Sequence, residues 1–145
     1  MLSEPEVIDA VCAKLVTQGY RILQQLGTTQ HGVDIVAVKQ TTPTRELYLE
    51  AKGATSSKKN SKRFGQPFGN DQIPDHVATA FYQVAKVLSN KRQDKVEIRA
   101  GIALPDKQKH RDCANDITWA LNQLGIAVLW VQEDRNVQVV STCAL

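Results

Sequence analysis

The stretch that most limits how this chain can fold lies between residues 31 and 53 and reads HGVDIVAVKQTTPTRELYLEAKG. It contains two short apolar runs, Val33–Val38 and Leu47–Ala51, on either side of a polar connection. Both runs are too short for helices and rich in β-branched, aliphatic and aromatic residues, so the pattern predicts an antiparallel β-hairpin. Charged residues interrupt it at Asp34, near the start of the first strand, and at Glu50 and Lys52, at the end of the second.

The hairpin geometry predicts where these charges meet. Chain direction reverses through a hairpin, so the start of one strand lies beside the end of the other. Side chains alternate along a strand, so Glu50 and Lys52 share one face while Ala51 points to the other. Asp34 joins that face if it pairs with Glu50, as a connection over residues 40–44 would arrange, whereas a register one residue different would place it on the opposite face.

Such a cluster has a recognisable chemistry. Two carboxylates on one face repel each other unless a positive charge lies between them, and either Lys52 or a divalent cation can supply it. Mg²⁺ prefers oxygen ligands and is usually held by one or two carboxylates together with water and phosphate oxygens. A metal in that position activates water and stabilises charge that develops on a phosphorus centre. A nearby lysine orients the nucleophile, lowers its pKa or neutralises the phosphate.

Asp34 followed by Glu50-Ala51-Lys52 at a strand end resembles the PD-(D/E)xK nuclease superfamily, which has the restriction-endonuclease-like fold. The Gly32-Val33-Asp34-Ile35 form is similar to that of Mrr-like and Holliday-junction-resolvase-like members. The resemblance implies a DNA endonuclease with Mg²⁺ or Mn²⁺ as cofactor. The metal ligands would be Asp34, Glu50 and the carbonyl of Ala51, and Lys52 would position or deprotonate the attacking water.

The resemblance also implies site residues on two helices. Many members carry a glutamate on the first helix that reaches the metal, and Glu6 matches it best, with Glu4 and Asp9 as fallbacks. For Glu6 we weigh this role evenly against that of a solvated acid at the positive end of a helix dipole. Some members carry a Gln on the helix after the second motif strand, and Gln83 matches it, although a half-exposed helical Gln is the commoner case.

Apolar periodicity and turn residues predict the other elements. The expected order is a helix from Ser3 as N-cap to Gly19, strands Tyr20–Leu26, Val33–Val38 and Leu47–Ala51, a helix His76–Asn90, a strand Val96–Leu104, a helix from about Asp106 to Leu124, and strands Ile126–Val131 and Asn136–Val140. This order predicts an α/β fold with the restriction-endonuclease-like αβββαβ core. Its mixed central sheet would be flanked by helices, with a C-terminal helix and two strands added. Trp119 and Trp130 are expected in the core.

Two basic segments are candidates for contact with nucleic acid. The loop over residues 54–75 is polar, has no acidic residue before Asp71 and is long for a connection inside one domain. We expect it to grip DNA through phosphate contacts and aromatic stacking, with a solvated charge run as the alternative. A second cluster opens the helix after residue 106, where free N–H groups add to the positive charge. The candidate residues are Lys58, Lys59, Lys62, Arg63, Phe64, Lys107, Lys109 and Arg111.

Composition narrows the class of protein. With 145 residues, a net charge of +3 and 42% hydrophobic residues, we expect one globular domain spanning residues 1–145. Three cysteines without metal-binding spacing, a polar start and no membrane-length apolar run favour a cytoplasmic location without membrane association. A homodimer is an expectation from the superfamily. The rival hypotheses are a catalytically inactive DNA-binding module on the same fold and an α/β protein-interaction domain.

Overall fold

The chain forms ten helices and strands over the residues that the structure, a computed structural model, describes: 1–27, 32–56, 60–143 and 145. The elements are α1 (Glu4–Thr17), β1 (Arg21–Gln25), β2 (Ile35–Lys39), β3 (Thr44–Ala51), α2 (Gln72–Asn90), β4 (Val96–Pro105), α3 (Gln108–Asp116), α4 (Thr118–Leu124), β5 (Ile126–Val131) and β6 (Val137–Val140). Lys58 and Lys59, two of the expected DNA contacts, lie outside the described residues.

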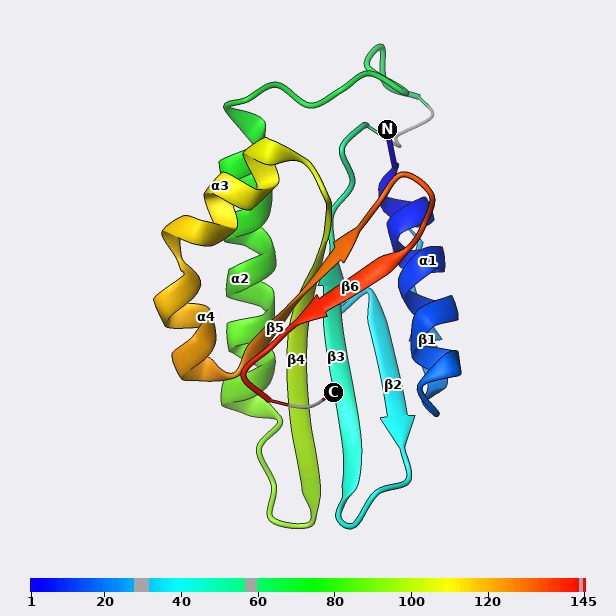
Figure 1. Ribbon diagram of the computed structural model, residues 1–145, viewed down its shortest axis with the longest axis vertical. Helices are drawn as coiled ribbons and strands as arrows, with labels where there is room; N and C mark the ends of the chain where they lie inside the picture. Colours follow the sequence, from blue (N-terminus) through cyan, green and yellow to red (C-terminus); the bar gives the residue numbers. More distant parts are fainter. Residues whose placement is uncertain (28–31, 57–59, 144) are drawn as a thin grey trace.

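The strands form one six-stranded sheet in the order β1-β2-β3-β4-β5-β6 (Figure 1). Neighbours are antiparallel except at the centre, where β3 pairs in parallel with β4 and β4 with β5. Parallel neighbours need a crossover connection, and α2 provides the one between β3 and β4. The expected α/β class with a mixed sheet flanked by helices is therefore confirmed.

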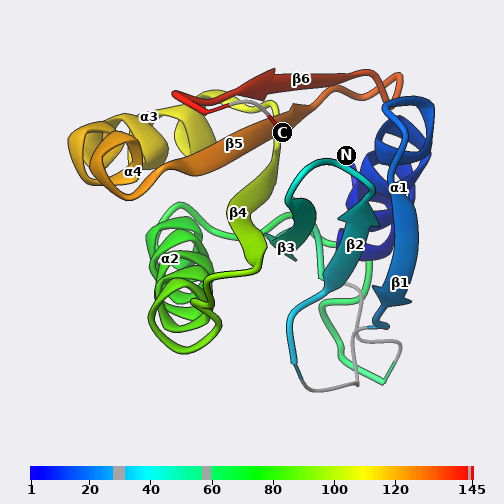
Figure 2. The same cartoon turned by 90° about the horizontal axis from the view of Figure 1, so that it is seen from below.

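Helices cover both faces of this sheet (Figure 2). The apolar stripe of α1, with Val7, Val11 and Leu15, packs on one face against residues of β2, β3 and β5. The stripe of α2, with Val77 and Val84, packs on the other face against β4 and β5, together with α3 and α4. The C-terminal parts of β3 and β4 are therefore buried on both faces, and a charged side chain at the end of β3 has little access to solvent.

The hairpin register is the one that brings the charged residues together. Lys39 pairs with Arg45 and Ile35 with Leu49, so continuation of the ladder sets Asp34 opposite Glu50. The connection between the paired residues is the expected one over residues 40–44. Glu50 itself pairs with Ile102 of β4, on the face that α2 covers. The cluster therefore lies where the parallel strands β3 and β4 end.

Three details differ from the sequence-based expectations. The helix expected from Asp106 to Leu124 is interrupted at Ile117, which ends α3 and precedes α4. Helix α2 starts a full turn before His76, with Asp71 at its N-cap position, so the basic loop is shorter than expected. Trp119 was expected in the core but is 76% exposed, because α4 directs it away from the sheet, whereas Trp130 is buried as expected.

Within the part of the chain that the structure describes, no helix combines the length and the apolar composition of a membrane span.

Candidate active site

Asp34 lies at the strand ends within the sheet, where backbone groups beside β1 and in β3 fix its position. It lies just before β2, and its backbone carbonyl accepts a hydrogen bond from the N–H of Leu26 at 2.8 Å, which prolongs the pairing of β1 with β2. Its Oδ2 accepts a bond from the backbone N–H of Ala51 at 2.7 Å, at the end of β3. The carboxyl is 8% exposed. Its position is therefore held by both neighbouring strands, independently of any ligand.

Glu50 and Lys52 occupy the same face, as the alternation predicted. Lys52 Nζ donates to Glu50 Oε1 at 3.0 Å. The second oxygen of Glu50, Oε2, is buried and has no hydrogen-bond partner among the described residues. A buried carboxylate oxygen without a partner carries the full cost of losing water. The site therefore contains one acceptor that no donor among the described residues satisfies.

The pKa values of both carboxyls show that this arrangement disfavours their charged forms. Burial, followed by the charge of Asp34, raises the pKa of Glu50 to about 7, although Lys52 opposes the shift. Burial likewise raises the pKa of Asp34, against the hydrogen bond from Ala51 and the charge of Lys52. The two carboxyls are close enough for a protonated Glu50 to donate to Asp34. A single lysine does not compensate for both carboxylates.

Lys52 is held in its charged form. Burial alone would lower its pKa, but the carboxylates of Glu50, Glu4 and Asp34 outweigh burial and raise it. A lysine with a raised pKa is a poor proton acceptor at neutral pH and a good positive charge. Of the two roles considered for Lys52, the geometry favours orientation and charge neutralisation over deprotonation of water.

The glutamate of the first helix that meets this cluster is Glu4. Burial raises the pKa of Glu4, and the charges of Lys52 and then Asp34 act on it. Glu6, which the sequence favoured, instead caps its own helix: Ser3 donates to Glu6 Oε2 through its backbone N–H at 2.8 Å and its hydroxyl at 2.9 Å. Its other oxygen accepts from Arg135 at 3.3 Å. The structure therefore brings the fallback residue Glu4, rather than Glu6, to the site.

Gly53 explains why the start of α1 lies so close. A Cβ built on Gly53 would fall 2.3 Å from the backbone nitrogen of Glu4 and 2.7 Å from the carbonyl carbon of Ser3. Only glycine permits this approach of backbone to backbone. A hydrogen bond from Ala54 N–H to the Leu2 carbonyl, 2.7 Å long, holds the two segments together. The residue after Lys52 thus sets the position of the helix that carries Glu4.

A cleft of about 400 Å³ opens beside Lys52. Its walls come from the start of α1, the loop after β3 and the first turns of α2; the lining residues are Glu4, Lys52, Gly53, Ser56, Ser61, Arg63, Phe68, Gln72, His76 and Thr79. His76 was not among the expected site residues. Burial, and then the charge of Lys52, lowers its pKa, so it is neutral at physiological pH. In the sequence, His76 and Thr79 are three residues apart and so share one face of the helix, which is the signal that could have indicated a shared site.

The remaining expected residues lie at varying distances from this cleft. On α2 the lining ends at Thr79, so Gln83, one turn further along, is not part of it. Arg63 lines the cleft, while Lys62 and Phe64 are exposed on the same loop. In the basic cluster at the start of α3, Lys109 is half-buried, and the other two members, Lys107 and Arg111, are already paired with acids. Lys107 bonds to Glu133 at 2.6 Å, and Arg111 bonds to both oxygens of Asp106.

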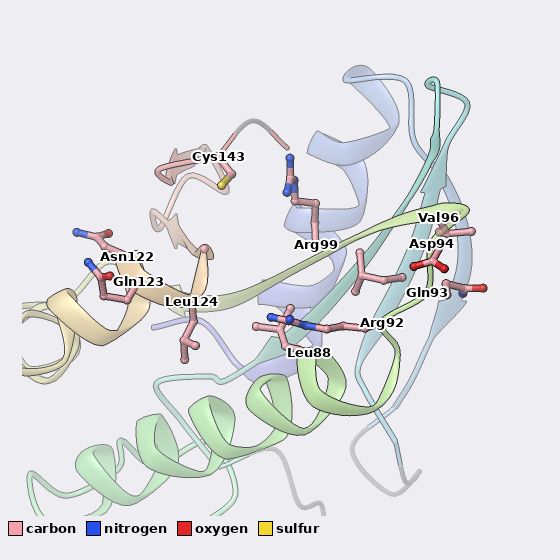
Figure 3. Close-up of a pocket in the computed structure, with 12 residues that line it drawn as sticks. Leu88, Arg92, Gln93, Asp94, Val96, Arg99, Asn122, Gln123, Leu124 and Cys143 are labelled. Carbon is pink, nitrogen blue, oxygen red and sulfur yellow. The ribbon is translucent and has the colours of Figure 1, made fainter.

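A larger cavity, of about 580 Å³, lies at the opposite end of β4 (Figure 3). Residues from the end of α2, the start of β4 and the end of α4 line it, among them Arg92, Arg99 and Asn122. In the close-up, Arg92 and Leu88 extend along one side of β4, and Arg99 projects from the other. None of the expected site residues lines this cavity, so its size does not make it the active site.

The charged cluster offers two carboxylates that could hold a hard divalent cation if water completed its shell. Within the described ranges no group of three or more His, Cys, Asp or Glu side chains is arranged to hold a metal ion by itself. Asp34 and Glu50 provide two carboxylates, one with an unsatisfied oxygen. Mg²⁺ is commonly bound by one or two carboxylates with water and phosphate oxygens completing its shell. Ala51 also contacts the cluster, because its backbone N–H donates to Asp34 Oδ2.

No protein-family model and no curated protein sequence matches this chain.

Proposed function

We propose that this protein is a metal-dependent endonuclease that hydrolyses phosphodiester bonds in DNA, built on the restriction-endonuclease-like arrangement that its sequence resembles. The observation that carries the proposal is the pair of buried carboxyls of Asp34 and Glu50 beside Lys52, with Glu50 Oε2 accepting from no donor among the described residues. Without a cation, Glu50 either shares a proton with Asp34 or leaves this oxygen unsatisfied, and both arrangements cost stability. A cation bound between the carboxylates would satisfy that oxygen.

Each residue of the cluster would have a distinct role. Asp34 and Glu50 would hold Mg²⁺ or Mn²⁺, with the Ala51 carbonyl as a further ligand from the resemblance. When bound, the metal would supply Lewis acidity toward the phosphate and lower the pKa of water. Lys52, charged and 3.0 Å from Glu50 in the present structure, would neutralise the scissile phosphate and orient the nucleophile. Glu4 would tune the local charge from the start of α1.

The contacts with DNA would come mainly from the loop after β3. Arg63 lines the cleft, and Lys62 and Phe64 are exposed beside it, so phosphate and base contacts are available there. A homodimer would place two such sites for the two strands of a duplex. The cysteines of the chain are free thiols, which suits the reducing cytoplasm.

The experiment that tests the proposal is cleavage of labelled nucleic acids with Mg²⁺, Mn²⁺ or EDTA. The panel contains linear and supercoiled duplex, single strand, flap and four-way junction, each incubated with wild type, Asp34→Ala and Lys52→Ala. We expect cleavage that requires metal and is lost in both variants. Glu97→Gln, which changes an acid at the other end of the sheet, is the matched control and should cut like wild type.

Two outcomes would contradict the proposal. If wild type and variants bind duplex equally and none cuts, the protein is an inactive DNA-binding module on the same fold. If it neither binds nor cuts any member of the panel, the α/β interaction domain becomes the better hypothesis.

A further inference from the structure

The cleft beside Lys52 is a half-open site that the charged cluster alone does not need. Metal and scissile phosphate require only the groups of Asp34, Glu50 and Lys52. The cleft continues from there between the loop after β3 and α2 and encloses about 400 Å³. That is the size range of small-molecule pockets, roughly 300–1,000 Å³. A regular duplex, whose bases are stacked and paired, has no part that enters such a space.

Aromatic rings form one wall of this cleft. Phe68 and His76 contact each other edge to face, with ring centroids 4.3 Å apart. They come from different segments, the loop after β3 and the second turn of α2, and both line the cleft. Aromatic side chains are the usual platforms on which unpaired bases stack, and this stacking tolerates any base. The wall therefore has the composition expected for a base.

Polar side chains line the same space. His76 contributes its ring to the wall, while its Nδ1 is buried away from solvent and has no partner among the described residues. The oxygen of Gln72 accepts from Gly69 N–H at 3.0 Å, which fixes the side chain and leaves its NH₂ group to donate elsewhere. Fixed donors and acceptors beside an apolar wall are what a base edge requires. Arg63 and Lys52 add positive charge at the rim, suited to the adjoining phosphates.

Resting on the proposed function, we infer that this cleft receives one unpaired nucleotide next to the bond to be cut. Its base lies against Phe68 and His76, its edge meets the NH₂ group of Gln72, and its phosphate reaches Lys52. The substrate class is thereby DNA with an unpaired nucleotide, such as a bulge, flap or single strand, rather than continuous duplex. Extrusion of a base costs least where the base is already unpaired, which gives the site its selectivity.

The test is a comparison of three DNAs of one sequence, measured by fluorescence anisotropy in EDTA so that nothing is cut. They are a paired duplex, the duplex with a one-nucleotide bulge, and the same bulge with an abasic residue in place of the base. We expect the bulge to bind about tenfold more tightly than the duplex, which is at the lower end of the stacking energy per base. The abasic bulge should lose most of that preference.

Variants locate the effect in the cleft. Gln72→Ala and Phe68→Leu should remove the preference for the bulge and leave duplex affinity within about twofold, since phosphate contacts are unchanged. His76→Phe keeps a ring but removes the nitrogens, and should retain part of the preference. Gln123→Ala, the same change at the far cavity, is the control and should behave like wild type.

The outcomes separate this inference from the proposed function. Equal affinity for all three DNAs, or a preference untouched by Gln72→Ala and Phe68→Leu, would overturn the cleft assignment. Metal-dependent cutting of paired duplex as fast as bulged DNA would also overturn it and leave the nuclease standing. A base-dependent preference in a protein that never cuts would support the cleft and overturn the nuclease.

Discussion

Charged side chains lie at both ends of the paired strands β3 and β4. Their surroundings shift the carboxyl pKa values in opposite directions at the two ends. Where the strands begin, Glu97 accepts from Arg45 Nε at 2.8 Å and forms a second ion pair with Arg99. The hydrogen bond from Arg45 is the main cause that holds the pKa of Glu97 below its ordinary value. Where the strands end, burial and a second carboxylate raise the pKa of Glu50.

The difference lies in the ratio of charges and in their burial. Where the strands begin, two arginines pair with Glu97, and solvent still reaches this acid, whose side chain is 26% exposed. At the second end one lysine serves Asp34 and Glu50, and the Glu50 side chain is 7% exposed. The first arrangement favours the folded state and the second opposes it. Stability therefore explains the first cluster, whereas the second requires another reason, which the proposed cation and phosphate would provide.

The largest effect should appear in catalysis. Asp34→Ala or Lys52→Ala should lower metal-dependent DNA cleavage by about a hundredfold to a thousandfold, the scale of losing one preorganised group at a reacting centre. Glu97→Gln should leave cleavage within about twofold of wild type. Initial rates on the best substrate of the panel, with thermal unfolding to verify that each variant is folded, check this. An equal loss in Glu97→Gln would show that the two ends do not differ in function.

Metal binding should separate the two ends without any turnover. A ligand at 100 times its Kd stabilises the folded state by about 2.7 kcal/mol, which corresponds to a rise in Tm of roughly 5–10 °C for a chain of this size. We expect Mg²⁺ or Mn²⁺ to produce such a rise in wild type and in Glu97→Gln, but not in Glu50→Gln. Differential scanning fluorimetry against metal concentration measures it. A rise retained in Glu50→Gln would place the metal elsewhere.

The register at the site could be predicted because it depends on local rules. The alternation of apolar and charged residues, with a connection over residues 40–44, set Asp34 opposite Glu50, and the structure pairs Lys39 with Arg45 accordingly. Gly125, with φ of 67°, ends α4 in the left-handed conformation that glycine adopts without strain, which is likewise a local rule. Each of these features is encoded within a few residues of the position that shows it.

Other features depended on tertiary contacts. The sequence placed Glu4 and Glu6 in one helical turn, and which of them reaches the cluster is decided by the close approach of Gly53 to α1. The Ser3-x-x-Glu6 spacing was a usable signal, since it is the pattern of a capping box. The exposure of Trp119 had no such signal, because the apolar period runs through the break at Ile117.

Stability against pH should change in opposite directions at the two ends. Since the folded pKa of Glu50 is raised from 4.5 to about 7, its contribution is full below pH 4.5 and is lost as pH rises through 7. In EDTA, the free energy of unfolding of Glu50→Gln should therefore rise relative to that of wild type between pH 4.5 and 7, by roughly 1–2 kcal/mol after allowance for solvent. Glu97, with a lowered pKa, stabilises above 4.5 and loses this as pH falls, so Glu97→Gln should lose stability at neutral pH. Urea titrations from pH 4 to 8 measure both; parallel curves would contradict the comparison.

The smallest effect should distinguish the glutamates of α1. Glu6→Ala removes the acceptor for both Ser3 donors and should cost about 0.5–1 kcal/mol of unfolding free energy, with the metal-induced rise in Tm unchanged. Glu4→Gln should change stability less, because no cap depends on it, but should weaken metal binding by roughly two- to fivefold through the lost negative charge. Urea unfolding gives the first quantity and metal titration the second. If Glu6→Ala weakened metal binding and Glu4→Gln did not, the influence of α1 on the site would come from the capping end of the helix, and the close approach at Gly53 would have no functional role.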